Sequence, residues 1–346
     1  MKHIWVVVAL VLMSSPSWGQ AGGLTNAETS DRESVSDPVK VMREAEGGWL
    51  AFSMPVLEGT RQPCCWQGNW NSSQHALREV GCYLGRQMQS YGSHSGSPLA
   101  ENVIAYMEIE DGRVRSLRVL GEQCPVDGGG ARVTWIGQVD EKAGLDWFEQ
   151  LARTSDTEAV AGTALYALSL HQSNKATERL TSMALQTDGE LQGEAVFWLG
   201  EGRGAEGFEA LEQLLAELPR GDVRREINFA LSLNGTDEAA ERLSEISRND
   251  GDPEQRAGAL FWLASEFPEQ ASSLVMQAIE HEQDEDVLEQ AVFAVSQLPD
   301  ETATPLLLEL ATDPSRSREV RRQALFWLAN SDDDEAIAAL VKLLSQ

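Results

Sequence analysis

The stretch Ala324-Leu325-Phe326-Trp327-Leu328 decides the fold, because close copies of it recur through the C-terminal half of the chain. Its aromatic residue, Phe326, has five earlier counterparts at intervals of 31 to 33 residues: Tyr166, Phe197, Phe229, Phe261 and Phe293. A regular period between about 20 and 50 residues is the signature of a repeat architecture. The sequence therefore predicts a stack of similar units.

Each unit has the apolar pattern of two helices. In the last unit, Val320, Ala324, Trp327 and Leu328 lie at i, i+4, i+7 and i+8, on one face of a helix. A polar turn and a second apolar periodic segment follow. The Val320 position is apolar in every earlier unit except one, which has Gln255. Since such a pair cannot bury its apolar face alone, we expect an α-solenoid of about six helix pairs over residues 141–346.

The position of Trp327 alternates between small and large side chains. Along the chain it holds Ala167, Trp198, Ala230, Trp262, Ala294 and Trp327. Because protein interiors are densely packed, we interpret Trp198, Trp262 and Trp327 as structural residues that fill the space left by alanine on a neighbouring unit.

The recurring aromatic position allows two interpretations. Phe326 lies about 140° around the helix from the apolar seam, so it does not face its own partner helix. The aromatic side chains could form a stripe that binds a partner. Alternatively, the first helices contact neighbours on both sides and need wide apolar coverage, which is the interpretation we favour. The candidate binding ladder comprises Tyr166, Phe197, Phe229, Phe261, Phe293 and Phe326.

The charge balance disfavours two classes of partner. The chain of 346 residues has 27 Lys and Arg against 55 Asp and Glu, which gives a net charge of −28. An acidic surface repels the phosphate backbone of nucleic acids and anionic lipids. We therefore expect neither nucleic-acid binding nor attachment to a membrane surface.

The N-terminus has the features of an export signal. Lys2 and His3 precede an apolar run at residues 4–13, and small residues at Ser17 and Gly19 favour cleavage before Gln20. We expect residues 1–19 to be a signal peptide and the mature protein to be periplasmic or secreted, without membrane insertion. An uncleaved anchor is the alternative. The polar residues 20–45 predict a disordered linker.

The four cysteines, Cys64, Cys65, Cys82 and Cys124, lie within one window of 61 residues. An even number in an exported chain favours two disulfide bonds. A bridge between adjacent Cys64 and Cys65 would need a strained ring, which leaves two connectivities. Zinc is the alternative, but the spacing lacks a C-x-x-C pair. We expect no metal and no cofactor.

Residues 46–140 predict a small antiparallel, β-rich domain. Alternating apolar residues flank Asp111-Gly112, which is a strong hairpin signal. Residues 49–56 and 131–139 predict further strands, whereas residues 64–70 predict an irregular loop. Residues 140–154 predict a helix at the start of the solenoid.

The repeat pattern resembles that of HEAT repeats. Val223-Arg224-Arg225 and Val320-Arg321-Arg322 open first helices and precede an Ala-x-aromatic-x-Leu core. The resemblance covers residues 156–346. Within this class, the repeats look most like the HEAT-like repeats of the phycobilin-lyase type. Together with the export signal and the cysteine-bearing domain, the chain resembles uncharacterised exported bacterial HEAT-repeat proteins. This resemblance implies a scaffold that binds other proteins.

No catalytic constellation is evident in the sequence. Deoxyhypusine hydroxylases, which also have HEAT repeats, hold a di-iron centre with several His-Glu pairs, and this chain has only His281-Glu282. The sequence therefore predicts an exported interaction scaffold with a protein or peptide partner in the cell envelope. The alternative is an enzyme or a small-ligand carrier with a site in the N-terminal domain, around Trp66, Trp70, His75 and His94.

Overall fold

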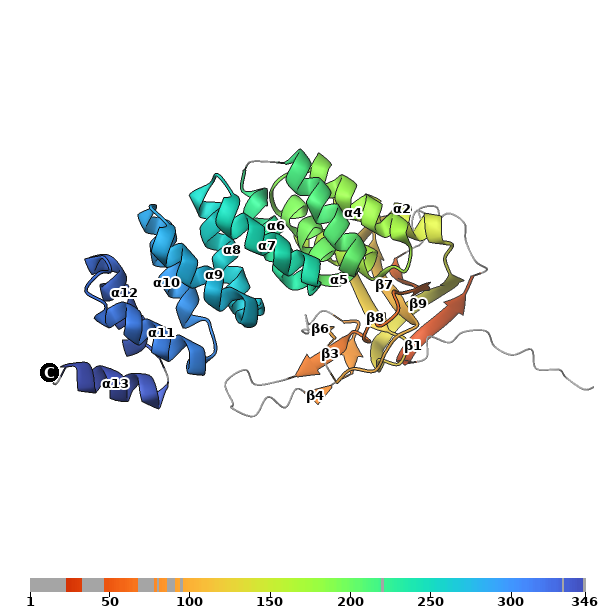
Figure 1. Ribbon diagram of the computed structural model, residues 1–346. Coiled ribbons are helices and arrows are strands. Elements are labelled where there is room, and N and C mark those ends of the chain that lie inside the picture. The colour runs from red at the N-terminus through yellow and green to blue at the C-terminus, as the bar shows by residue number, and fades with distance from the viewer. Residues whose placement is uncertain are drawn as a thin grey trace, which may run out of the picture. The chain divides into compact units, whose positions relative to one another are not determined.

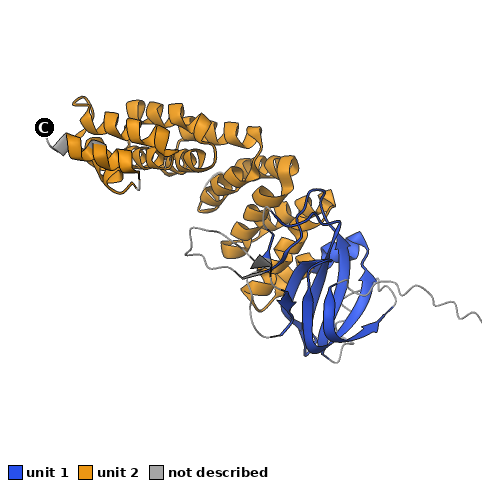
Figure 2. Ribbon diagram, turned by 90° about the horizontal axis from the view of Figure 1, so that it is seen from below, with its two compact units in different colours: residues 1–147 blue, residues 148–346 orange. Residues whose placement is uncertain are grey.

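The computed structural model describes residues 23–32, 47–67, 78–79, 81–85, 91–93, 96–218, 221–331 and 333–344. The expected signal peptide, residues 1–19, lies outside them. The chain forms two compact units, which divide between Trp147 and Phe148 (Figure 2). This division falls inside helix α2, Glu141–Thr154, rather than at residue 140. The first half of α2 belongs to the N-terminal unit because Trp147 stacks on Phe52, with ring centroids 5.3 Å apart.

The N-terminal unit is built on a mixed sheet with the strand order β1-β9-β2-β7-β8 (Figure 1). The short strand β5, Cys82–Tyr83, also pairs with β9. The strands on the main path are β1 Leu24–Asp31, β2 Gly48–Pro55, β7 Asn102–Glu110, β8 Arg113–Gly121 and β9 Val126–Gln138. A second, smaller sheet has the order β4-β3-β6, with β3 at Cys64–Gln67, β4 at Arg78–Glu79 and β6 at Tyr91–Gly92.

The predicted hairpin at Asp111-Gly112 is confirmed. It joins β7 to β8, and both turn residues have positive φ angles, 52° and 72°. Such a turn matches the right-handed twist of the strands that it connects.

Three expectations for the N-terminal unit were wrong. The sheet is mixed rather than antiparallel, because β9 pairs in parallel with β1, β2 and β5. Within the supposed linker, β1 pairs in parallel with β9, for example with Ala27 opposite Ala131. The sequence hides this strand because β1 is an edge strand whose side chains are mostly exposed, so no apolar alternation marks it. Within the supposed loop, β3 forms a short strand between β4 and β6.

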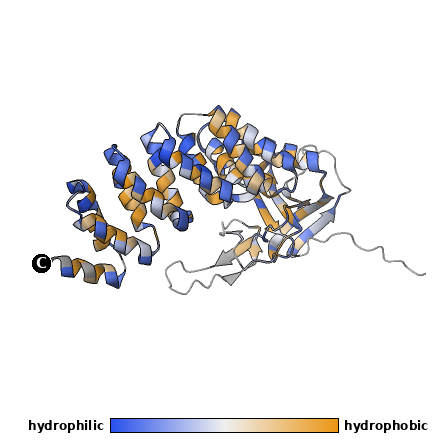
Figure 3. Ribbon diagram, viewed as in Figure 1, coloured by the Kyte–Doolittle hydropathy of each residue, from blue (hydrophilic) through white to orange (hydrophobic). Residues whose placement is uncertain are grey.

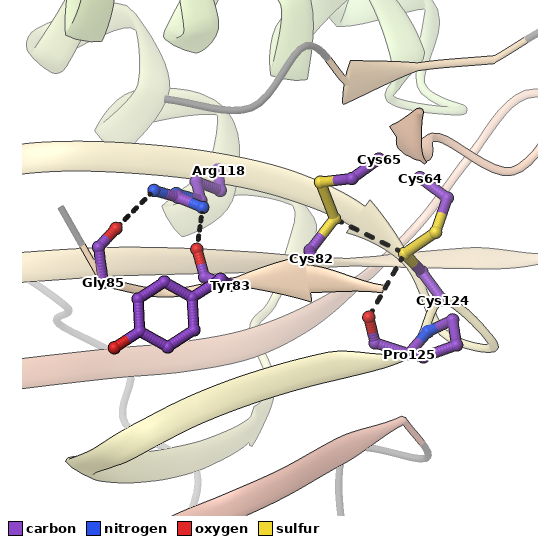
Figure 4. The surroundings of a disulfide bond; sticks show 8 residues. All are labelled: Cys64, Cys65, Cys82, Tyr83, Gly85, Arg118, Cys124 and Pro125. Carbon is purple, nitrogen blue, oxygen red and sulfur yellow. Dashed lines mark hydrogen bonds between the residues drawn. A yellow bond between two sulfur atoms is a disulfide. The ribbon is translucent and has the colours of Figure 1, made fainter. Parts of the chain in front are cut away.

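The two expected disulfide bonds are confirmed, and their connectivity is Cys64–Cys124 and Cys65–Cys82 (Figure 4). The Sγ atoms of Cys82 and Cys124 lie 3.6 Å apart, so the two bridges pack against each other within the buried core. The bridges close segments of 60 and 17 residues, and each contributes about 3–4 kcal/mol in the chain-entropy account.

The C-terminal unit contains six helix pairs within the described residues, as the period of the sequence predicts. Its helices are α3 Glu158–Leu170, α4 Asn174–Gln186, α5 Gly189–Glu217, α6 Val223–Asn234, α7 Asp237–Asn249, α8 Pro253–Glu266, α9 Pro268–His281, α10 Glu285–Ser296, α11 Asp300–Thr312, α12 Arg318–Ala329 and α13 Asp334–Leu344. The long α5 supplies both helices of the second pair, separated by a kink at Gly204. We number the pairs as repeats one to six.

The apolar seam between the helices is the core of this unit. The position of Leu328 is completely buried in all six repeats, where it holds Leu168, Leu199, Leu231, Leu263, Val295 and Leu328. Figure 3 shows hydrophobic residues along the helices and hydrophilic residues at many of the helix ends. In the part of the chain that the structure describes, no helix has the length and apolar content to cross a membrane.

Candidate functional site

The recurring aromatic residues form one continuous row of ring contacts along the first helices of the repeats. Successive centroids lie between 4.6 and 6.0 Å apart. In order of contact, the rings are Tyr166, Trp198, Phe197, Phe229, Trp262, Phe261, Phe293, Trp327 and Phe326. We call this row the aromatic ladder. The predicted ladder residues and the three alternating tryptophans are thus parts of one structure.

The alternation of tryptophan and alanine sets how successive repeats are joined. Trp262 lies between two ladder rings, 4.6 Å from Phe229 on the preceding repeat and 4.7 Å from Phe261 on its own. Where the later repeat has alanine instead, the ladder rings touch directly, as Phe261 and Phe293 do at 5.5 Å. The ladder therefore alternates between bridged and direct steps.

The tryptophans lie at the edge of the seam rather than inside it. Trp198, Trp262 and Trp327 are half-buried, whereas the alanines at the same position in other repeats are completely buried. Each indole ring packs on the aromatic ring of the preceding repeat. Each tryptophan thus links its repeat to the preceding one through an aromatic ring contact.

The ladder is also accessible from one side, where it lines a cavity of about 820 Å³. The cavity opens over α6, α8 and α10, and its aromatic floor comprises Phe229, Phe261, Trp262 and Phe293. We call it the ladder groove. Further along the row, Phe326 is 50 % exposed. Packing and accessibility therefore coexist in the same rings, and the two interpretations of the aromatic position do not exclude each other.

An acidic row runs parallel to the ladder. Seven residues before the ladder position, on the same helix face, repeats two to six have Glu190, Asp222, Glu254, Asp286 and Glu319. Seven residues separate an acid from its aromatic residue by about 10 Å along a helix. Sequence reasoning missed this row, although its spacing equals that of the ladder.

The groove itself is strongly acidic. Its lining includes one guanidinium group, that of Arg225, and five carboxylates: Glu226, Asp252, Glu254, Asp284 and Asp286. Three of the carboxylates have partners within the array. Asp252 accepts a hydrogen bond from the backbone N–H of Glu254, Asp284 accepts from those of Asp286 and Val287, and Glu254 pairs with Arg225 at 2.8 Å. The hydrogen bond from Arg225 to Glu254 raises the pKa of that guanidinium.

Two groove carboxylates are not engaged in this way. Across residues 221–331, no hydrogen bond or ion pair of the array involves the carboxylates of Glu226 and Asp286. The counterpart of Glu226 in repeat two is Glu194, where burial and then the charges of Glu190 and Glu158 raise the pKa. Glu226 and Asp286 thus add negative charge beside the ladder that no ion pair within residues 221–331 compensates.

A buried polar pair lies in the groove wall. Asn228 donates from Nδ2 to Oε1 of Gln255 at 3.1 Å and to its main-chain oxygen at 3.3 Å, and both residues are buried. Gln255 is the single exception in the Val320 position that the sequence analysis noted. Asn228 is likewise an exception, because the other repeats have apolar residues there: Leu165, Val196, Leu260, Val292 and Leu325.

The pair leaves one polar atom without a partner. Oδ1 of Asn228 is buried and accepts no hydrogen bond within the described structure, and Asn228 lines the groove. An unsatisfied buried acceptor costs about 1–3 kcal/mol, so it is rare in a native core. An apolar residue would serve packing better at this position, as it does in the other repeats.

The alternative site in the N-terminal unit lies outside the described residues. This holds for Trp70, His75 and His94, and for the side chain of Trp66. Elsewhere in the described chain, the one group of residues with metal-ligand geometry is Cys64, Cys82 and Cys124, whose sulfur atoms belong to the two disulfide bonds.

The chain matches two repeat families. Residues 241–318 match the HEAT repeats family, and residues 320–346 match the PBS lyase HEAT-like repeat family. No curated protein sequence matches the chain.

The solved structures that match this chain share little sequence with it. The karyopherin Kap121p, bound to the C-terminus of the phosphatase Cdc14p, is 16 % identical with a TM-score of 0.37; the match covers 54 % of this chain and 25 % of that one. The CpcE and CpcF complex of phycocyanin lyase from Nostoc sp. PCC7120 is 19 % identical with a TM-score of 0.33, over 57 % of this chain and 87 % of that one. The match therefore spans only a quarter of the karyopherin.

The family matches cover most of the last four helix pairs, and the ladder and the buried seam extend the same pattern through the first two. This chain is a HEAT-repeat protein.

Proposed function

We propose that this chain is an exported protein-interaction scaffold that binds a protein partner in the ladder groove. The observation that carries the proposal is the accessible run of aromatic rings on the floor of a cavity of about 820 Å³. Aromatic side chains are enriched at interfaces and among the residues that contribute most to binding. The volume also lies within the usual range of binding sites, about 300–1,000 Å³.

The groove has the rigidity that a binding surface needs. Each floor ring touches another ring of the ladder. The helices that carry these rings, α6, α8 and α10, are anchored by completely buried seam residues such as Leu231, Leu263 and Val295. A surface that is already ordered loses little conformational entropy when a partner binds. The array therefore presents its aromatic face without a folding step.

Two features of the sequence support export. The positive start, the apolar run and the small residues before Gln20 are those of a signal peptide. Disulfide bonds such as Cys64–Cys124 persist in oxidising compartments. We place the partner in the cell envelope. Mass spectrometry of the protein from its native cells tests this step, since the mature chain is expected to begin at Gln20 and an uncleaved N-terminus contradicts it.

Site-directed photocrosslinking in the native cells tests the scaffold. A photoreactive residue at Gln290, in the groove, is expected to capture a discrete partner, whereas one at Gln277, exposed on the second helix α9, is not. The change Phe293→Leu keeps apolar volume but removes a floor ring, and it is expected to weaken capture from position 290. Equal capture from both positions, or none from position 290, contradicts the proposal.

A further inference from the structure

We propose that the partner segment in the ladder groove is an extended basic peptide, whose lysine or arginine side chain lies across the aromatic floor between Glu226 and Asp286. This inference rests on the proposed function, because it names the chemistry of the partner for the same groove. Three independent features of the groove carry it: its charge, its aromatic floor and the buried acceptor of Asn228.

The charge of the groove selects a cation. Five carboxylates and one guanidinium group line it. The carboxylates of Glu226 and Asp286 have no partner within the described array. The chain is acidic everywhere, so carboxylates alone would select nothing. Here they lie beside the accessible rings of Phe229, Phe261 and Trp262, and the face of an aromatic ring attracts ammonium and guanidinium groups. A cation on the floor therefore meets both kinds of attraction.

The buried acceptor requires a hydrogen-bond donor. Asn228 lines the groove, its buried Oδ1 has no partner within the described structure, and the orientation of the amide is fixed because Nδ2 donates to Gln255. An ammonium group, a guanidinium group or a peptide N–H can supply the missing hydrogen bond, whereas an apolar or anionic ligand cannot. The polar pair Asn228–Gln255 replaces the apolar residues that the other repeats have at these positions. It does so beside the groove, where a bound ligand could form hydrogen bonds with it.

The periodicity of the array favours a peptide over a small free amine. The acidic row repeats once per first helix, and packed helices lie about 8–10 Å apart. A peptide in the extended polyproline II conformation has three residues per turn and advances about 3.1 Å per residue, so every third side chain lies on the same face and meets the same position of the next repeat. A segment with basic residues at every third position thus places one cation on each of several successive repeats.

Fluorescence anisotropy with defined probes tests the inference on the full chain. The first probe is a labelled twelve-residue peptide with lysine at every third position, and the second has glutamine at the same positions. The lysine probe is expected to bind with an affinity that falls as the salt concentration rises, because its ion pairs are partly exposed. The changes Glu226→Gln and Asp286→Asn are each expected to weaken binding about threefold.

A double variant separates binding from stability. Asn228→Leu with Gln255→Val installs the apolar residues of the other repeats, so the protein is expected to keep or raise its melting temperature while its affinity for the lysine probe falls about tenfold. A merely structural role of the pair would leave binding unchanged. The matched control is Glu241→Gln with Glu309→Gln, which removes two exposed charges from second helices and is expected to leave the affinity unchanged.

Three outcomes overturn the inference. Equal binding of the lysine and glutamine probes removes the role of charge. Loss of affinity in the control variant attributes binding to the overall charge rather than to the groove. Binding of free spermidine as tight as that of the lysine probe replaces the peptide by a small amine. If position 290 still captures a protein in any of these cases, the scaffold stands and only its partner chemistry is wrong.

Discussion

Repeats three and four share their ring geometry with repeats five and six but differ beneath the rings. Phe229 lies 4.6 Å from Trp262, and Phe293 lies 4.7 Å from Trp327, so both pairs of repeats are joined by the same bridged step. Under the first step lie Asn228 and Gln255; under the second lie Val292 and Val320, all four of them buried. The ladder therefore needs no polar pair. Rings are a packing feature of the whole array, and the polar pair is a feature of one place.

The sharpest test of this comparison is to remove one ring from each region. Trp262→Ala and Trp327→Ala are each expected to lower the free energy of unfolding by about 3 kcal/mol, since each ring packs between two others. Only Trp262 lines the groove, so only its removal is expected to abolish binding of the lysine probe. Chemical denaturation and anisotropy measure the two effects. An unchanged transition in both variants would show that the bridged step does not join repeats.

The second test moves the polar pair. Val292→Asn with Val320→Gln builds the pair at the corresponding position of repeats five and six. The change is expected to destabilise the array by about 2 kcal/mol, because it buries polar atoms without a ligand to satisfy them. Hydrogen exchange of α10 and α12 locates the effect. If the transplanted pair costs nothing, the pair in repeats three and four no longer implies a ligand.

A third test concerns the junction between the two regions. Arg256 on α8 donates to Glu282, which precedes α10, at 2.9 Å, and this hydrogen bond holds the pKa of Glu282 below its usual range. A lowered folded-state pKa stabilises the protein above the unfolded value, and this contribution is lost as the pH falls through the folded value. Glu282→Gln is therefore expected to cost about 1 kcal/mol at pH 7 and nothing once the carboxyl is protonated. Urea titrations across the acid range measure it; a difference that persists in acid contradicts the linkage.

The smallest expected effect is a gain. Arg225 is the one cation in the groove lining and pairs with Glu254 and Asp222. Arg225→Gln frees Glu254, so the affinity for the lysine probe is expected to rise about twofold, with little change in stability because the pair is exposed. Weaker binding would mean that the guanidinium itself contacts the peptide.

Much of the array could be predicted from the sequence. The period of the aromatic position gives six helix pairs, and the alternation at Trp327 shows that repeats come in two kinds. The position of the tryptophan rings could not be predicted. Helical periodicity assigns Trp327 to the face of Val320, but the indole is large enough to reach Phe293 on the preceding repeat. Ring size, rather than position in the pattern, decides where the ring packs.

The candidate site could be predicted only in part. The ladder residues and the exception at Gln255 are visible in the sequence, but Asn228 is not, since one polar residue beside an aromatic one carries no signal until its burial is known. In the N-terminal unit, two segments form strands because they pair with other strands, which their amino-acid composition does not indicate. β1 is polar because it is an exposed edge strand, and β3 forms a strand at Cys64 and Cys65 because it pairs with β4 and β6.

The alternation of bridged and direct steps has a consequence for the length of the array. A deletion of one helix pair from its middle would place two tryptophans, or two alanines, on adjacent repeats. The first case would give two bridged steps in succession, and the second would give two direct steps in succession. A deletion of two adjacent pairs preserves the order. The unit whose insertion or deletion preserves the alternation is thus the double repeat of about 64 residues. Relatives that gain or lose length are expected to do so in even numbers of helix pairs.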